Sequence, residues 1–243
     1  MTPEYFSILA VIAVLSVVQS LFGMGVLVFG TPTLLLMGFD FIPTLGYLLP
    51  ASFAISLLQV LSARHDRVPV SRYLFLLCLP AIGVGLWLAE ASPLATWSRT
   101  LIGGTLLFSA LVRFWAPSRN LLITFLEKQS PAYHFVMGLV HGLTNLGGAL
   151  LAILASGTHS EKGAIRSSVA QYYLAFSTIQ MMFLAFFMGH SDLFISNLLT
   201  AVVSASVYLL IGNRIFSYTS SPVYNVALSV FIALYGVVVL IDF

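Results

Sequence analysis

Charged residues are scarce in this chain. Asp, Glu, Lys and Arg make up only 7% of the 243 residues, whereas 59% are hydrophobic, and the mean hydropathy is +1.02. Such a composition cannot cover a water-exposed surface, and the polar stretches are too short for a separate soluble domain. The chain is therefore expected to be an integral membrane protein that lies in the lipid bilayer.

Cysteine and clustered positive charge are also scarce. The single cysteine, Cys78, excludes an internal disulfide and a metal site with several cysteine ligands, and it stands in an apolar run that is typical of a packing residue. The net charge is +2, and no run of Lys and Arg resembles a nucleic-acid-binding stripe. We expect no nucleic-acid partner, no metal site and no cofactor.

Acidic residues and catalytic motifs are missing from the apolar segments. Every Asp and Glu stands at or near a segment end; the eight residues are Glu4, Asp40, Asp66, Glu90, Glu127, Glu161, Asp192 and Asp242. A cation site or proton relay built from carboxylates is therefore not expected. No Gly-x-Ser-x-Gly, paired-aspartate or His-Glu-x-x-His arrangement occurs in the apolar segments, which argues against an intramembrane enzyme with catalytic residues.

Glycine interrupts the apolar sequence in both halves of the chain. In the first half the interruption is Phe22-Gly23-Met24-Gly25, followed by Gly30-Thr31-Pro32, and in the second half it is Asn145-Leu146-Gly147-Gly148. A break in a membrane helix leaves backbone N–H groups without partners inside the helix, and such groups can point at a ligand. A transport protein is the simplest interpretation.

The two interruptions belong to a weak internal repeat. Polar and glycine residues near them match at nearly constant offsets: Gln19 with His141 and Gly25 with Gly147 at 122 positions, and Gln59 with Gln180 at 121. Matches of this kind are expected for an old duplication in apolar sequence.

The apolar runs give each repeat the same plan, a broken or re-entrant helix unit followed by three transmembrane helices. The first repeat covers residues 1–115, with the broken unit at 4–37 and spans at 45–63, 70–89 and 97–115. An amphipathic connector at 116–130 leads to the second repeat at 131–243, with the broken unit at 133–156 and spans at 164–189, 193–211 and 222–241.

The positive charges indicate how the broken units lie in the membrane. If each unit crossed once, the ten Lys and Arg would divide six to four; if each unit enters and returns, or crosses twice, nine lie on one side and only Arg99 on the other. The positive-inside rule favours the second arrangement. We therefore predict an all-α polytopic protein of the cytoplasmic (inner) membrane, built from two inverted repeats, with both termini outside the cytoplasm.

The two breaks and their surroundings resemble one known family. An apolar helix runs into a glycine-rich turn, a short apolar piece with Pro32 follows, and Gly38 precedes a loop; after a central connector, the break returns as Thr144-Asn145-Leu146-Gly147-Gly148. This order is similar to the sulfite exporter TauE/SafE family, also called the toluene sulfonate uptake permease family, and 162–168 resembles that family's start of the next helix. The family's longer glycine run is reduced here to Gly-Met-Gly. The resemblance implies a transporter of sulfite, sulfoacetate or other sulfonates.

The breaks also suit an anion on chemical grounds. Backbone N–H groups at Gly23, Met24, Gly25, Gly147 and Gly148, at the positive ends of short helices, can bind sulfonate oxygens without a buried full charge. A small anionic, sulfur-containing substrate is therefore the expected ligand.

Side chains near the breaks complete the candidate site, and each has a structural alternative. Polar residues that bind the substrate or satisfy freed backbone and neighbouring helices are Gln19, Thr31, Ser52, Gln59, His141, Asn145 and Gln180. Arg166 is expected either to attract or gate the anion, or only to contribute to the positive-inside orientation of the protein in the membrane. His141 is the first candidate for proton coupling. Tyr172 and Tyr173 line the path or mark the membrane interface.

Two modes of action are compatible with these residues. The leading one is a secondary transporter or facilitator that moves its substrate by relative movement of the two halves. The alternative is an anion or small-solute channel, for which broken helices are also suitable. A homodimer is compatible with the sequence.

Overall fold

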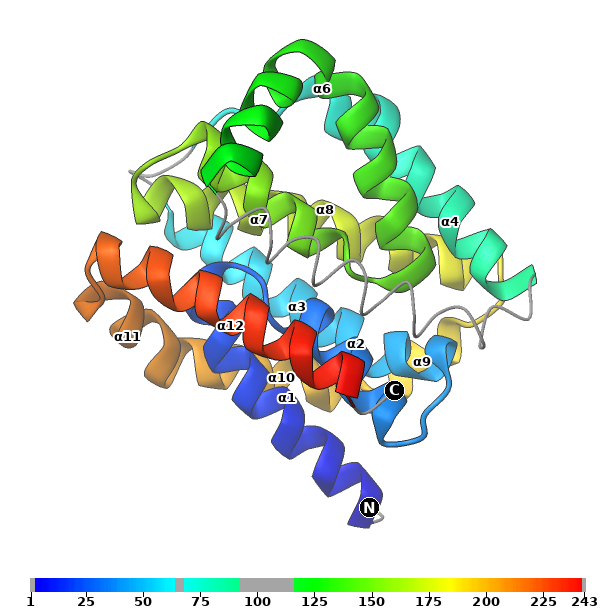
Figure 1. The fold of residues 1–243 in the computed structure, drawn as a ribbon. Helices are drawn as coiled ribbons and strands as arrows, with labels where there is room; N and C mark the ends of the chain where they lie inside the picture. Colours follow the sequence, from blue (N-terminus) through cyan, green and yellow to red (C-terminus); the bar gives the residue numbers. More distant parts are fainter. Residues whose placement is uncertain (1–2, 64–67, 92–115, 242–243) are drawn as a thin grey trace.

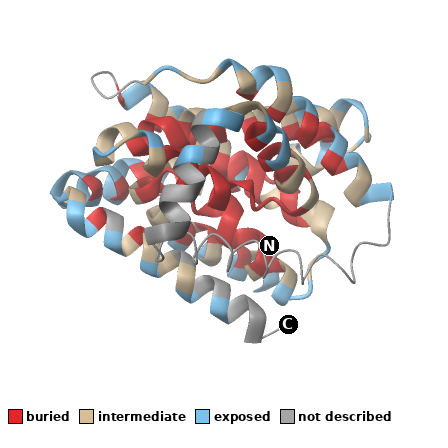
Figure 2. Ribbon diagram, turned by 45° about the horizontal axis from the view of Figure 1, so that its top comes forward, coloured by how far each residue is buried: buried red, intermediate tan, exposed pale blue. Residues whose placement is uncertain are grey.

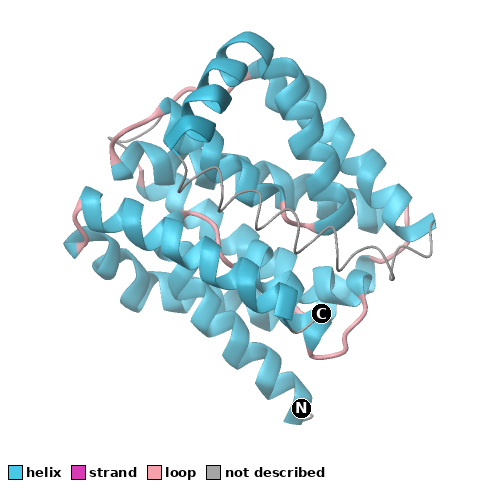
Figure 3. Cartoon of the chain, in the orientation of Figure 1, coloured by secondary structure: helices cyan, strands magenta, loops and turns pink. Residues whose placement is uncertain are grey.

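Every regular element in the described part of the chain is a helix (Figure 1, Figure 3). The computed structural model describes residues 3–63, 68–91 and 116–241, so the predicted span at 97–115 lies outside the described residues. The helices are α1 (Pro3–Phe22), α2 (Val26–Leu36), α3 (Phe41–Ser62), the π-helical turn η1 (Leu74–Cys78), α4 (Leu79–Ala91), α6 (Ala116–Thr144), α7 (Gly147–Thr158), α8 (Lys162–Phe186), α9 (Ser191–Ser196), α10 (Leu198–Val207), the π-helical turn η2 (Tyr208–Gly212), α11 (Asn213–Tyr218) and α12 (Ser221–Ile241).

Five helical stretches of the described residues are long and apolar enough to cross a membrane. They are Pro3–Phe22, Phe41–Ser62, Leu74–Ala91, Lys162–Phe186 and Leu198–Tyr218. By contrast, α2 has 11 residues and α7 has 12, so at 1.5 Å per residue each covers only about half of the ~30 Å hydrocarbon core. The chain is therefore a multi-pass helical membrane protein that contains two short apolar helices.

The connector and the second broken unit share one long helix. α6 runs from Ala116 to Thr144, and its backbone leaves the helical region only at Gln129 (φ −128°, ψ 33°), two residues before Pro131. The proline ring crowds the preceding turn and removes one backbone donor, which explains a kink at this place. The sequence predicted a boundary at residue 130, and the structure has a kink within one helix there.

Both short helices fold back against the helix that precedes them. In the second half, the Tyr133 hydroxyl donates to the carbonyl of Leu150 at 2.7 Å, which joins the start of this unit to the first turn of α7. In the first half, a Cβ atom on Gly30 would lie 3.4 Å from the Leu15 side chain, and one on Gly25 would lie 2.9 Å from the Leu15 carbonyl. Each broken unit is thus a helical hairpin.

The helices of the two halves exchange contacts in a regular way. α3 and α8, the long helices that follow the hairpins, pack against each other, α10 packs against α1 and α3, and α4 packs against α6 and α8. The third long helix of each half therefore lies against the hairpin of the other half.

Close contacts between helices depend on small residues. A Cβ on Gly85 of α4 would lie 2.6 Å from the Leu139 carbonyl of α6, and Gly138 and Gly142 of α6 face the backbone of Cys78 and Ile82. On the other side, the hydroxyls of Ser16 and Ser204 lie 2.8 Å apart where α1 meets α10. Such small residues let membrane helices approach closely enough for dispersion contacts to hold them together.

Apolar side chains cover the outside of the bundle as well as its centre. Buried residues gather in the middle of the molecule (Figure 2), yet large apolar side chains are exposed on the outer faces of several helices. Phe75, Trp87 and Phe187 are 60%, 57% and 79% exposed. A surface of this kind is unstable in water and is suited to contact with lipid chains.

Candidate functional site

The first hairpin turns at a left-handed glycine. Gly23 has φ +80°, and its N–H donates to the carbonyl of Gln19 at 2.8 Å, which ends α1. Two residues later, a Cβ on Gly25 would lie 2.6 Å from the backbone nitrogen of Gln19. Glycine is therefore required at position 25 because α2 starts directly against the backbone of α1.

The second hairpin turns with the same geometry. Asn145 is the one non-glycine residue with positive φ in the described part of the chain (φ 62°), and its N–H donates to the carbonyl of His141 at 2.7 Å. Asparagine tolerates this conformation better than most other residues. A Cβ on Gly147 would lie 2.5 Å from the Cβ of His141, so this glycine is also fixed by packing.

Gln19 ties the first break together. Its Oε1 accepts a hydrogen bond from the N–H of Val26 at 3.0 Å, and its Nε2 donates to the Ser52 carbonyl and to the hydroxyls of Ser52 and Ser56, each at 3.1 Å. Gln59 Nε2 donates to the carbonyls of Gln19 at 2.9 Å and Ser20 at 3.2 Å, in the last turn of α1. Gln19 and Gln59 therefore bond the backbone around the first break, and Gln19 also bonds the side chains of Ser52 and Ser56 on α3.

A directed chain of hydrogen bonds occupies the second break. Asn145 Nδ2 donates to the Thr31 hydroxyl at 2.8 Å, Gln180 Nε2 donates to Asn145 Oδ1 at 3.3 Å, and the remaining link joins Gln180 Oε1 to His141 Nε2 at 3.1 Å. Because Gln180 Oε1 can only accept, His141 carries its proton on Nε2. Thr31 belongs to α2, so this chain connects the two hairpins.

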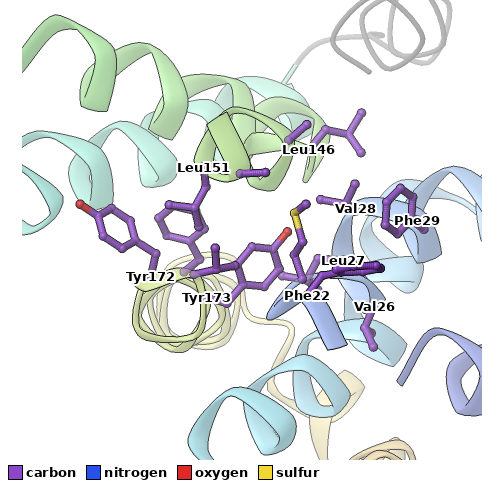
Figure 4. Packing of buried hydrophobic residues seen from close by; sticks show 14 of the residues in the cluster. Phe22, Val26, Leu27, Val28, Phe29, Leu146, Leu151, Tyr172 and Tyr173 are labelled. Carbon is purple, nitrogen blue, oxygen red and sulfur yellow. The ribbon is translucent and has the colours of Figure 1, made fainter. Parts of the chain in front are cut away.

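The two breaks meet in the interior of the molecule. Val28 of α2 lies beside Gly148 of α7, and α8 passes both breaks, with Val169 against Gly23 and the Tyr173 hydroxyl against Gly148. Figure 4 shows Tyr173 reaching from α8 toward Val28 and Leu146. Met24 and every other predicted glycine and polar residue of the breaks are fully buried or nearly so.

The comparisons with known proteins bear directly on this pair of hairpins. The family model described as "Sulfite exporter TauE/SafE" matches residues 8–239, which is nearly the whole chain. The protein belongs to the TauE/SafE sulfite exporter family. Members of this family are membrane transporters, as the breaks and the composition indicated. No curated protein matches the chain, and no solved structure matches it.

Two cations of this TauE/SafE chain lie together beside the first hairpin. Lys162 donates to the carbonyl of Phe216 at 2.8 Å and also to that of Thr219, at the end of α11. The Arg166 guanidinium lies 3.3 Å from the centre of the Phe216 ring, and its Nη1 donates to the carbonyl of Ser20 at 3.2 Å. Arg166 is thus 7% exposed and bonded to the end of α1, outside the group formed by Thr31, His141, Asn145 and Gln180.

The loop before α8 places one histidine and one acidic residue, His159 and Glu161, beside these cations. Partial burial lowers the pKa of His159, in the loop before α8, so this ring is neutral at pH 7. With His159 neutral, the charged side chains at this end of α8 are Glu161, Lys162 and Arg166, so one positive charge is left in excess.

Three functional candidates were not in the predicted site. Tyr173 was expected to line the path or mark the membrane interface, and the structure places it at the second break, completely buried. His134 bonds Tyr172 at 2.9 Å near the start of the same hairpin and is 1% exposed. Tyr224 of α12 donates to the carbonyl of Phe22 at 3.4 Å. Of the three, only Tyr173 had a signal in the sequence, because it lies on the same predicted helix as the candidate site residues Arg166 and Gln180.

Proposed function

We propose that this protein is a secondary transporter or facilitator that moves a small sulfur-containing anion across the cytoplasmic membrane. Sulfite, sulfoacetate and other organosulfonates are the substrate class. The anion binds inside the membrane, where the two hairpin turns meet. Membership of the TauE/SafE family supports the class of substrate, and the geometry of the breaks supports the location.

One observation carries the location. No hydrogen bond in the described part of the chain involves the backbone N–H groups of Met24 and Gly25 in the first break or those of Gly147 and Gly148 in the second. These groups are buried at the positive ends of α2 and α7, and no acidic side chain lies beside them. Buried N–H groups without partners are costly, and an anion satisfies them without a buried cation.

The burial of both turns defines how transport must work. Every residue of the two turns is buried, so a substrate reaches them only if the hairpins or α8 move relative to one another. The hydrogen bond from Asn145 to Thr31 is one link between the hairpins that such a movement must break or carry along. Movement of one half against the other around a central site is the usual behaviour of transporters built from repeats.

Binding to the purified protein is the first test. The protein in detergent is heated with sulfite, sulfate, thiosulfate, sulfoacetate, isethionate, taurine, acetate or chloride, at several pH values and with or without sodium. A ligand at tenfold excess over its Kd stabilises the folded state by on the order of 1 kcal/mol, which raises the unfolding temperature. We expect a sulfur oxyanion to give this shift and acetate and chloride to give none.

Transport in liposomes is the second test. Protein reconstituted with unlabelled substrate inside is expected to show counterflow of labelled substrate and saturation at modest concentration. Flux that rises linearly with concentration and shows no counterflow would establish a channel. Stabilisation by none of the sulfur anions would refute the proposed substrate class.

A further inference from the structure

The two breaks share a backbone geometry but differ in what their side chains do. At the first break, Gln19 places its Oε1 at the N-terminus of α2 and accepts the N–H of Val26. A carboxamide oxygen in this position does what an anion's oxygen would do, because it accepts a hydrogen bond at the positive end of the helix. The same break holds Gln59 Oε1, a buried acceptor without a partner, which would repel an anion's oxygen.

At the second break, the equivalent residue leaves the helix N-terminus open. His141 stands 122 positions after Gln19, but its Nε2 bonds Gln180, and its ring packs against Gly147. The N–H of Leu146 is satisfied within the turn by the Thr144 hydroxyl at 3.2 Å, whereas those of Gly147 and Gly148 have no acceptor among the described residues.

Two buried side chains beside this second turn have polar atoms without hydrogen-bond partners. The Tyr173 hydroxyl is 0% exposed, has no hydrogen-bond partner and lies against Gly148. His141 is also 0% exposed, and its Nδ1 has no partner. A hydroxyl can rotate to donate, so the second turn offers two backbone donors and one side-chain donor close together.

We infer that the anion binds at the second break alone, and that Tyr173 is a substrate-binding residue. The N–H groups of Gly147 and Gly148 and the hydroxyl of Tyr173 donate to the anion's oxygens. His141 Nδ1 carries no proton because Nε2 does, so it accepts a hydrogen bond from a singly protonated anion such as hydrogen sulfite. At the first break Gln19 Oε1 occupies the N–H of Val26, which corresponds to Gly148 at the repeat offset of 122, so this donor is not open to an anion there. This inference rests on the proposed transport of a sulfur anion and specifies where that anion is held.

The contact between Tyr173 and α7 also explains why residue 148 is glycine. A Cβ atom at position 148 would coincide with the Tyr173 hydroxyl and would also meet Val28, so only glycine lets the tyrosine reach the end of α7. The tyrosine and the glycine therefore form one binding element, with α8 supplying the hydroxyl and α7 the N–H groups.

The decisive experiment compares two tyrosines that both have buried hydroxyls without partners. Sulfite and sulfoacetate are titrated against the wild type, Tyr173→Phe and Tyr208→Phe, with unfolding temperature as the readout. Tyr208 lies in η2, away from the second turn, and serves as the matched control. Tyr173→Phe should raise the half-saturating anion concentration about tenfold or more, because a hydrogen bond to a charged group is lost. Tyr208→Phe should leave it unchanged.

The outcomes separate this inference from the proposed function. If the wild type binds a sulfur anion and Tyr173→Phe binds it equally well, the assignment to the second break is wrong while the transport proposal stands. Absence of binding to the wild type removes both.

A structure with selenite, whose selenium scatters X-rays anomalously, supplies an independent readout. The inference predicts an anomalous peak beside Gly147 and Gly148, and a peak beside Gly25 instead would overturn it. Tyr173→Phe without anion should unfold at or above the wild-type temperature, since it removes an unsatisfied hydroxyl. A large drop in that temperature would show that the hydroxyl is structural.

Discussion

Buried polar side chains are the most informative residues of this membrane protein. Each break frees carbonyls at the end of one helix and N–H groups at the start of the next, and no water is available in the bilayer core to satisfy them. Gln59 and Arg166 supply donors to the carbonyls at the end of α1, and Gln19 supplies an acceptor to α2. At the first break, Gln19 and Gln59 thus make the hydrogen bonds that the structural alternative requires, and a role in substrate binding stays a prediction.

Replacement of Gln19 by methionine tests this structural role at the residue scale. Gln19→Met keeps the approximate volume but removes four hydrogen bonds and leaves the N–H of Val26 without an acceptor. We expect a loss of roughly 2–3 kcal/mol of stability, since buried hydrogen bonds in membrane proteins contribute about 0.6 kcal/mol each and orphaned groups add to the cost. The unfolding temperature in detergent, without substrate, measures it.

A second glutamine provides the comparison. Gln171 also donates to a carbonyl of another segment, that of Val68 at 3.1 Å, but it is only half-buried and makes no contact with a break. Gln171→Met should cost much less than Gln19→Met. Equal losses in the two variants would mean that Gln19 has no special part in holding the hairpin.

At the scale of elements, two glycines of α4 allow the effect of helix packing on stability to be distinguished from the effect of helix propensity. Gly83 and Gly85 are two residues apart in one helix, so alanine raises helix propensity equally at both. A Cβ at 85 would lie 2.6 Å from the backbone carbonyl of Leu139, whereas one at 83 would meet only the side chain of Phe183 at 3.2 Å. The backbone of α6 cannot yield as a side chain can.

Gly85→Ala is therefore expected to destabilise the protein by roughly 1–3 kcal/mol, the usual cost of overpacking, while Gly83→Ala stays near the wild type. Unfolding temperature in detergent and the yield of monodisperse protein are the two measurements. If both variants behave alike, α4 and α6 are not in close contact at this position.

The sequence predicted where the two helix breaks lie, but it did not predict which side chains pack against them. Glycine clusters in apolar runs located both turns, because a positive φ at Gly23 and close packing at Gly25 leave few other choices. Asn145 was matched with the first glycine break, and the structure gives it the same left-handed conformation as Gly23. The partners of Gln19 and Tyr173 could not be predicted, since they come from α3 and α7 and depend on how the helices pack.

At the scale of the whole molecule, contacts between the ends of helices indicate which helix ends lie on the same side of the membrane. The arrangement in which the hairpins return places the ends of α4 and α8 on one side of the membrane, and His190 lies 3.2 Å from Glu90 there. It places the starts of α3 and α9 on that side too, and Gly46 packs against Leu193. Lys162 and the end of α11, which belong to the positively charged side, are also joined. These contacts agree with the arrangement in which the hairpins return, and the inverted repeat itself stays a prediction.

Cysteine labelling decides between the two topologies. Cys78 is the single native cysteine and is buried, so Cys78→Ala provides a background for Gln129→Cys, Ser160→Cys or Ser191→Cys at exposed positions. If the second hairpin enters and returns, a membrane-impermeant maleimide labels Ser191→Cys on intact cells and reaches the other two only after permeabilisation. A hairpin that crossed once would instead put positions 129 and 160 on opposite sides, and labelling of one without the other would refute the inverted repeat. The two positions flank the unit that holds Gly147 and Gly148, so labelling of both from the same side of the membrane would place this turn inside the bilayer.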